Sequence, residues 1–208
     1  MTATTEEQAL PNLGPAATAA RIAALSHWIN SGPTYVGLDF ETRGWRRLAK
    51  VSEENGEVTE AWLGTIGENQ RKGRHKTASD VVYELLDVAT SALGAMENLG
   101  GDIPVALAHL CNGLDYVTAN EDDTEAEVWH RLGLLTNLVG KATASWLAAI
   151  SIRHSTGQWS DHGEVIARLF EVAAAALDAV ERFTTEPGGA VTLLASHVAY
   201  VHERAGLS

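Results

Sequence analysis

Cysteine and basic residues are scarce in this sequence, and each shortage excludes a class of function. The 208-residue chain has one cysteine, Cys111, which rules out an intramolecular disulfide and a zinc site built mainly on thiolates. Lys and Arg number 15 against 27 Asp and Glu, so the formal net charge is -12. Because phosphate backbones and anionic lipids require a basic surface, we expect no nucleic-acid partner and no membrane partner.

Long apolar runs are missing as well. No run approaches the ~20 residues that a helix needs to cross a bilayer. The first residues have neither the basic start nor the apolar core of a signal peptide. A single cysteine suits a reducing compartment, so we expect a cytoplasmic protein. Hydrophobic residues make up 45% of the chain, which is typical of a folded globular protein.

The alternation of polar and apolar residues that marks half-buried strands is nearly absent. We interpret the one weak strand-like stretch, 34–43, as a loop. Apolar residues recur instead with the period of an α-helix. The pattern predicts helices over seven ranges, which are 16–30, 45–66, 80–99, 103–118, 125–152, 163–183 and 189–204. Ser79 is the expected N-cap of the helix over 80–99. The sequence therefore predicts an all-α fold.

The chain aligns with itself at an offset of 84 residues, without a gap. Trp45 and Trp62 fall on Trp129 and Trp146, and two pairs of glycines coincide at the same offset. Chance agreement between Ala-rich helices is the alternative, but it explains the tryptophan and glycine pairs poorly. We predict a helical bundle of two tandem repeats related by a pseudo-twofold axis, which is an internal pseudo-dimer. The expected parts are a flexible lead-in over 1–14, a first repeat over 15–119 and a second repeat over 120–208.

Acidic residues are paired at helical spacing in the first repeat. Glu54 and Glu57 lie three residues apart, and Glu84 and Asp87 repeat this spacing on the next predicted helix. If the two helices pack together, four carboxylates meet, and two unit charges 4 Å apart repel by about 4 kcal/mol at an effective dielectric of about 20. A divalent ion with oxygen ligands relieves this repulsion, which favours Mg²⁺, with Mn²⁺ as a second candidate. A solvated acidic face is the alternative.

The second repeat serves as an internal comparison for these acids. Glu53, Glu54, Glu57 and Glu84 are replaced at the 84-residue offset by Asn137, Leu138, Lys141 and Arg168. Asp87 alone keeps its charge, as Glu171. We therefore expect the second repeat to bind no metal and to hold an ion-pair cluster of Lys141, Arg168 and Glu171. The alternative is that Lys141 and Arg168 point into solvent.

Basic residues gather next to the acidic pairs, with eight of the 15 Lys and Arg between positions 43 and 76. Lys50 lies one helical turn before Glu54, and Arg71 and Lys72 lie in the loop between the two acidic helices. In an acidic protein, basic groups beside a metal site favour a polyphosphate ligand. Lys50, Arg71 and Lys72 are therefore the candidate phosphate-binding residues, and a solvated basic loop is the alternative.

The two-part acidic motif resembles that of the MazG-like, all-α nucleotide pyrophosphohydrolases, a superfamily that includes the dimeric dUTPases. The motif is Glu53-Glu54-x-x-Glu57 followed, after 26 residues, by Glu84-x-x-Asp87. The preceding Arg47-Leu-x-Lys50, the following Glu-Ala-Trp and the run Gly-Glu-Asn-Gln-Arg-Lys-Gly over 67–73 are similar too. The resemblance covers 45–99 and reaches 129–201 only through the repeat.

This resemblance implies a Mg²⁺-dependent enzyme that cleaves a nucleoside triphosphate to a monophosphate and pyrophosphate. Glu54, Glu57, Glu84 and Asp87 would be the metal ligands, and Glu53 would help to hold a metal or orient the attacking water. The fused, degenerate second repeat departs from the family pattern, and a homodimer stays open. A non-catalytic module that binds a nucleotide–metal complex is the main alternative. A purely structural helical adaptor is the third.

Overall fold

The computed structural model describes residues 14–68, 71–114, 124–159, 162–184 and 189–207. These residues form seven helices and no strand, so the predicted all-α class is confirmed. The helices are α1 (Pro15–Ser31), α2 (Phe40–Ile66), α3 (Ala78–Asn98), α4 (Ile103–Leu114), α5 (Glu125–Thr156), α6 (Gly163–Glu181) and α7 (Gly189–Arg204). Residues 1–13 of the lead-in expected over 1–14, and the expected end of α4 at position 118, lie outside the described residues.

The start of α2 differs from the prediction. The stretch 34–43 was expected to be a loop, but its last residues belong to α2, which begins at Phe40. Asp39 caps this end by accepting a hydrogen bond from a backbone N–H of the first turn over 2.7 Å. The Phe40 ring packs against Trp146 and Trp159, with centroid distances of 5.9 and 5.0 Å. This tertiary contact favours the earlier start and was not visible in the local pattern.

The N-terminus of α3 also corrects the prediction. Its N-cap is Thr77 and not Ser79, and Thr77 forms a reciprocal capping box with Asp80. The Thr77 backbone N–H donates to Asp80 Oδ2 over 2.7 Å. The end of α2 agrees with the prediction, because Gly67 adopts the left-handed conformation that terminates a helix. These two boundaries set the length of the connection between α2 and α3.

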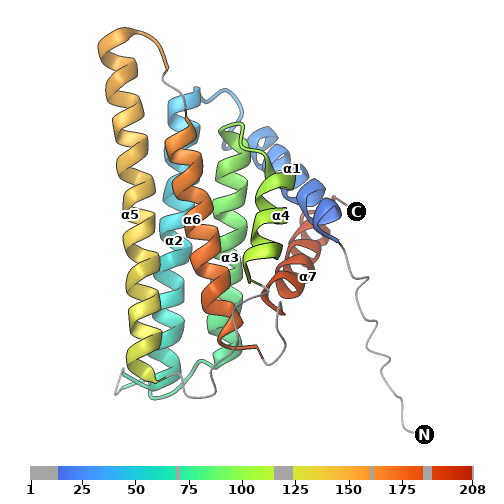
Figure 1. Ribbon diagram of the computed structural model, residues 1–208, viewed down its shortest axis with the longest axis vertical. Helices are drawn as coiled ribbons and strands as arrows, with labels where there is room; N and C mark the ends of the chain where they lie inside the picture. Colours follow the sequence, from blue (N-terminus) through green and yellow to red (C-terminus); the bar gives the residue numbers. More distant parts are fainter. Residues whose placement is uncertain (1–13, 69–70, 115–123, 160–161, 185–188, 208) are drawn as a thin grey trace, which may run out of the picture.

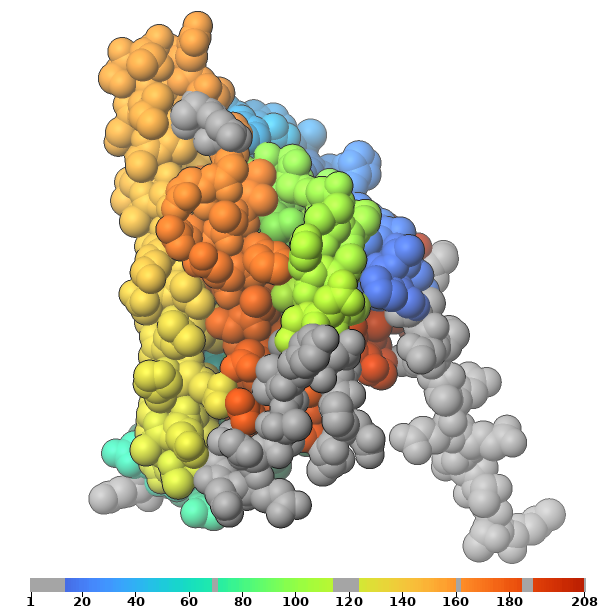
Figure 2. All heavy atoms as spheres, in the orientation of Figure 1, coloured from blue at the N-terminus to red at the C-terminus, as the bar shows by residue number. Residues whose placement is uncertain are grey.

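Four long helices, α2, α3, α5 and α6, stand side by side, and α3 packs extensively on α2 and on α6 (Figure 1). Helix α4 packs on α6, α7 packs on α3, and α1 contacts α3, α4 and α7. Figure 2 shows α5 along one edge of the molecule and α1 at the opposite edge. Among the described residues, we find no helix whose length and apolar character would allow it to cross a membrane.

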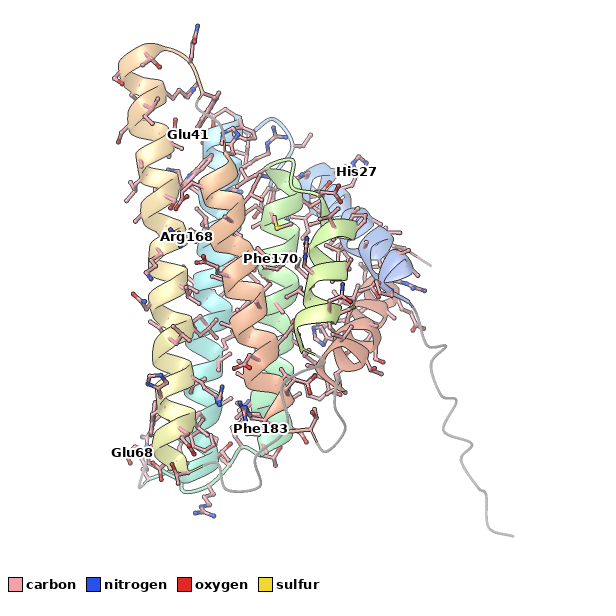
Figure 3. All side chains as sticks on the ribbon, viewed as in Figure 1. His27, Glu41, Glu68, Arg168, Phe170 and Phe183 are labelled. Atoms are coloured by element: carbon pink, nitrogen blue, oxygen red, sulfur yellow. The ribbon has the colours of Figure 1, made fainter. Side chains whose placement is uncertain are left out.

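The start of α2 lies beside the end of α5. Glu41, labelled in Figure 3, accepts hydrogen bonds from Arg153 over 3.0 Å and pairs with His154 over 3.1 Å. Trp146 of α5 packs directly on Gly44, where a Cβ atom would lie 2.2 Å from the indole ring. Helices α2 and α5 therefore approach closely at this point because Gly44 has no side chain.

The two halves bury corresponding positions in one shared core. Leu48, Val51, Leu85, Val88 and Leu93 are buried, and so are Leu132, Leu135, Leu169, Val172 and Leu177, which lie 84 residues later. Helix α2 packs on α3 as α5 packs on α6, and the contact of α3 with α6 joins the halves. The boundary between the two predicted repeats lies outside the described residues. The tandem repeat, its pseudo-twofold axis and a homodimer stay predictions.

Candidate metal centre

Three carboxylates from two helices come together at the middle of the α2–α3 pair. Glu54 of α2 and Glu84 and Asp87 of α3 each place an oxygen atom within 4.8 Å of the others. The spacing of three residues puts Glu84 and Asp87 on one face of α3, and the packing of α3 on α2 brings Glu54 to that face. Glu54 is buried, with 6% of its surface exposed. We call Glu54, Glu84 and Asp87 the acidic triad.

Burial and mutual repulsion disfavour negative charge in the acidic triad. Burial raises the pKa of Glu54 to about 7, Asp87 and Glu57 add to the rise, and Lys50 opposes it. Burial also raises the pKa of Glu84, with Glu57 and Asp87 as the next contributions. Ionised carboxylates at this site therefore need a compensating positive charge.

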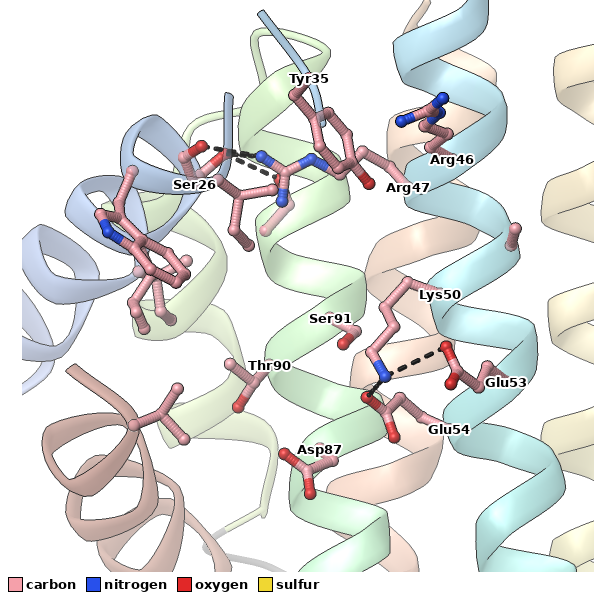
Figure 4. Close-up of a pocket in the computed structure, with 17 residues that line it drawn as sticks. Ser26, Tyr35, Arg46, Arg47, Lys50, Glu53, Glu54, Asp87, Thr90 and Ser91 are labelled. Carbon is pink, nitrogen blue, oxygen red and sulfur yellow. Dashed lines mark hydrogen bonds and ion pairs between the residues drawn. The ribbon is translucent and has the colours of Figure 1, made fainter. Parts of the chain in front are cut away.

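Lys50 supplies part of that charge. Its Nζ lies 2.7 Å from Glu54 Oε1 and 3.1 Å from Glu53 Oε2. Dashed lines in Figure 4 mark both interactions. Burial opposes the charge on Lys50, but the hydrogen bonds to Glu54 and Glu53 outweigh it and raise the pKa of the amine. Glu53 itself is largely exposed, with 57% of its side chain accessible. The predicted phosphate-binding lysine thus neutralises two of the predicted functional acids.

Glu57, the fourth predicted ligand, lies at the border of the acidic triad. It is exposed on α2 and is not among the described groups whose oxygen atoms approach within 4.8 Å. Its hydrogen bond with Glu54 and its repulsion of Glu84 both raise the pKa of the partner, so its carboxylate is close to theirs. The structure therefore brings three of the predicted ligands together and places the fourth beside them.

The loop between α2 and α3 contributes a different lysine from the predicted ones. Arg71 and Lys72 are exposed, and Lys72 lines a small cavity with Glu60 and His75 instead of facing the triad. Lys76 is the loop cation whose positive charge opposes the raised pKa of Glu84. The stem of Lys76 crosses α2 at Gly64, where a Cβ atom would lie 2.6 Å from it. This glycine is the sequence signal that could have pointed to Lys76.

His197 of α7 is a site residue that the sequence did not reveal. Its Nε2 lies 2.9 Å from Asp87 Oδ1, and 5% of its side chain is exposed. No pair of histidines in the sequence has the spacing of metal ligands, so the sequence alone does not single out His197. Since His197 reaches Asp87 only through the packing of α7 on α3, no local pattern could have identified it.

A cavity of about 530 Å³ opens beside the acidic triad, between α1, α2 and α3. Glu53, Glu54 and Asp87 line one end, and Tyr35 lies at the other (Figure 4). Trp28 adds a second aromatic side chain to the walls. Its volume lies in the ~300–1,000 Å³ range of small-molecule sites, and its walls combine apolar and aromatic groups with a few converging polar ones. We call it the α1 cavity.

Arg47 fixes the wall of the α1 cavity. Its Nη2 donates to the carbonyl and hydroxyl oxygens of Ser26 over 2.8 and 3.1 Å and to Asn30 Oδ1 over 2.9 Å. The Arg47 and Arg46 guanidinium groups lie 5.4 and 5.6 Å from the Tyr35 ring centroid. Arg47 is buried, so it holds α1 against α2, while Arg46 lies at the cavity edge.

On α5 and α6, the positions that lie 84 residues after the predicted ligands form no acidic cluster, and the arginine among them is paired with acids. Arg168 lies 2.7 Å from Glu164 and 2.9 Å from Glu171, and Figure 3 marks its place on α6. Lys141 is exposed and pairs with none of the described acids, so its predicted part in the cluster was wrong. Leu138, the counterpart of Glu54, is buried in the core. An apolar residue thus replaces the acid there, and Arg168 pairs with acids of its own helix.

The donor set fits a hard divalent cation. Carboxylate oxygens are the ligands that Mg²⁺ and Mn²⁺ prefer, and the close group contains no thiolate and one neighbouring imidazole that is bound to Asp87. Comparisons of the chain with models of known protein families, with curated proteins and with solved structures find no match.

Proposed function

We propose that this protein is a Mg²⁺-dependent nucleoside triphosphate pyrophosphohydrolase with one active site, formed by α2 and α3 beside the α1 cavity. The observation that carries the proposal is that Glu54 and Asp87, two members of the acidic triad, line one end of a cavity with aromatic walls. A triad in a solvated acidic face would have no such cavity. The resemblance of the acidic motif to MazG-like enzymes points to the same function.

Each group near the triad has a defined task in this proposal. Glu54, Glu84 and Asp87 would hold Mg²⁺, with Glu57 available as a fourth carboxylate at the border. When bound, the ion stabilises negative charge on the phosphates and lowers the pKa of a coordinated water. Glu53, exposed at the cavity edge, would orient the attacking water and accept its proton.

The basic and aromatic groups would bind the nucleotide. Lys50 now pairs with Glu54 and Glu53, and a divalent ion would take over the neutralisation of Glu54. The lysine amine would then be available for the phosphates, together with Lys76. Trp28 and Tyr35 present aromatic walls on which a base can stack. Arg71 and Lys72 have no assigned contact with the substrate in this arrangement.

A panel of nucleoside triphosphates with Mg²⁺ tests the function directly. We expect release of pyrophosphate and the monophosphate from at least one member, and loss of this activity in Glu84→Gln. Glu60→Gln, an exposed acid of α2 outside the triad, is the matched control and should retain activity. Absence of pyrophosphate from every triphosphate in the panel would overturn the proposal.

A non-catalytic nucleotide–metal module is the second candidate, and one contact favours it. Lys50 pairs with both Glu54 and Glu53, so the carboxylate that would activate water is held in an ion pair. A module that only binds a nucleotide–metal complex needs no free carboxylate for this task. Calorimetry of the same nucleotides with Mg²⁺ separates the two candidates. Saturable binding without any product would support the module, whereas turnover would exclude it.

A further inference from the structure

A second cavity lies on the other side of Asp87 from the α1 cavity. It has a volume of about 820 Å³ and lies between α3 and α7. Asp87 and Val201 line both cavities. We call this second space the α7 cavity. The function proposed above uses the α1 cavity and the acidic triad and assigns nothing to the α7 cavity.

Both cavities lie along a single face of α3. Ser79 and Tyr83 line the α7 cavity, Asp87 lies at the junction, and Thr90 and Gly94 line the α1 cavity. Steps of three and four residues place these positions in one stripe along the helix. The acidic triad is therefore flanked by two spaces of small-molecule size, one toward each end of α3.

The walls of the α7 cavity suit an organic group and not a bare pyrophosphate. Tyr83, Tyr200 and Phe183 supply three aromatic rings, and Arg204 supplies a cation. A pyrophosphate leaving group is small and highly charged, so it needs several cations or N–H donors and gains nothing from aromatic surface. Aromatic walls with one cation instead fit a planar ring joined to an anionic group.

His197 adds a polar contact point that the protein itself does not use. The side chain is buried and lines the α7 cavity, and its Nε2 is hydrogen-bonded to Asp87. Its Nδ1 is buried without a hydrogen-bond partner among the described residues. The imidazole is therefore a polar part of the wall at the point where the α7 cavity meets Asp87.

We propose that the α7 cavity binds a second nucleoside, so that the preferred substrates are dinucleoside diphosphates, in which a second nucleoside esterifies the β-phosphate. This inference rests on the proposed pyrophosphohydrolase function and narrows its substrate class. One nucleoside occupies the α1 cavity, the two phosphates lie over the acidic triad, and the second nucleoside occupies the α7 cavity. Asp87, shared by both cavities, marks the position of the phosphates.

The reaction balances with water as the only co-substrate. The water oxygen forms a bond to one phosphorus, and the bond from that phosphorus to the bridging oxygen breaks. The bridging oxygen leaves on the other phosphate. The products are two nucleoside monophosphates, and the two protons of the water pass to solvent. No oxidant, reductant or group carrier takes part.

The test compares symmetric dinucleoside diphosphates of adenine, guanine, cytosine and uracil with the corresponding triphosphates, using kcat/KM with Mg²⁺. We expect at least one dinucleoside diphosphate to exceed its triphosphate by about tenfold or more, which is the size of one stacking contact. If triphosphates are cleaved and no dinucleoside diphosphate is, the α7 cavity proposal fails while the proposed function stands. If neither class is cleaved, both fail.

Two variants and one control locate the second nucleoside. Ser196→Trp fills the α7 cavity, and Thr192→Trp places the same side chain on an exposed position of α7 outside it. The ratio of kcat/KM for dinucleoside diphosphate over triphosphate should fall about tenfold in Ser196→Trp and stay constant in Thr192→Trp. Tyr200→Ala, which removes an aromatic wall of the α7 cavity at a residue that is 52% exposed, should lower the same ratio. A ratio unchanged in Ser196→Trp and Tyr200→Ala would overturn the proposal.

Discussion

The helix pairs α2–α3 and α5–α6 bury corresponding positions but differ in charge. The first pair buries an acid, and the second has an apolar residue at the corresponding position. Glu54 is 6% exposed and its counterpart Leu138 is 9% exposed, so both positions belong to the core. In α2–α3 this position carries an acid whose pKa burial raises to about 7. In α5–α6 it carries leucine, and the nearby Arg168 pairs with Glu164 and Glu171.

This comparison separates what the fold needs from what a ligand site needs. Leu138 shows that an apolar side chain satisfies the packing at this position, so a carboxylate there is not a requirement of the bundle. Burying an ionised carboxylate costs free energy unless a partner compensates it. Lys50 compensates Glu54 in part, while burial, followed by repulsion from Glu57 and Asp87, still raises the pKa of Glu84. The proposed divalent ion at α2–α3, without one at α5–α6, would account for the difference.

The largest expected difference is in activity: neutralising Asp87 should lower it strongly, whereas neutralising Glu171, the counterpart on α6, should not. In Asp87→Asn, a triad oxygen loses its charge, and kcat/KM for the cleaved nucleotide should fall by roughly 100- to 1,000-fold, as for other electrostatic groups. Glu171→Gln removes the corresponding charge from α6, where Glu171 pairs with Arg168, and activity should not change. Steady-state kinetics of both variants measure this. Equal losses would show that the two helix pairs do not differ in chemistry.

Metal binding should stabilise the protein through α2–α3 alone. At one hundred times the dissociation constant, an ion that binds only the folded state adds about 2.7 kcal/mol to the free energy of unfolding. For a chain of this size, Tm should rise by roughly 5–10 °C with Mg²⁺. Glu54→Leu, which copies Leu138, should abolish the rise. Thermal unfolding with and without Mg²⁺ measures this rise in Tm. A rise in Glu54→Leu as large as in the wild type would show that the ion binds elsewhere.

The pH dependence of stability in the metal-free protein should reveal how much the ionisation of buried Glu54 destabilises the fold. Its pKa is about 7 in the folded protein and 4.5 as a reference, so the folded state binds its proton more tightly. The stabilising contribution of Glu54 is therefore complete below pH 4.5 and is lost as the pH rises to about 7. Glu84, whose pKa is also raised, acts in the same direction.

The measurement is the difference in Tm between the wild type and Glu54→Leu, in the presence of a chelator, at about pH 5 and about pH 8. Asp39 and Asp80 have lowered pKa values and act in the opposite direction, but both proteins contain them. The variant should gain stability relative to the wild type as the pH rises. A difference that does not depend on pH would show that Glu54 ionises as easily as in the unfolded chain.

Local patterns in the sequence were sufficient to predict the seven helices of the described residues and the proximity of three of the four acids that we predict to be ligands. Glu84 and Asp87 share a face of α3 by spacing alone, and Glu54 joins them because α2 and α3 are neighbours in sequence. The start of α2 at Phe40 was missed because it depends on packing against Trp146 of a distant helix. Patterns of spacing carry information about one helix and its immediate neighbour.

Contacts between distant segments could not be predicted in the same way. His197 reaches Asp87 across 110 positions of the chain, through the packing of α7 on α3. The loop residues Arg71 and Lys72 were chosen by composition, but the path of the loop brings Lys76 toward Glu84. The contact of His197 with Asp87 and the approach of Lys76 to Glu84 both depend on how distant segments pack. Local spacing in a single sequence does not determine that packing.

Removing the compensating cation of α6 should have the smallest effect. Arg168 pairs with Glu164 and Glu171 on its own helix, and its side chain is 33% exposed. Ion pairs of this kind contribute up to about 1 kcal/mol, because solvent screens them and the side chains lose entropy. Arg168→Ala should therefore lower the free energy of unfolding by less than about 1 kcal/mol and leave nucleotide cleavage and the Mg²⁺-induced rise in Tm intact. Chemical denaturation measures the first, and a loss of the Mg²⁺ response would mean that α5–α6 takes part in the metal site.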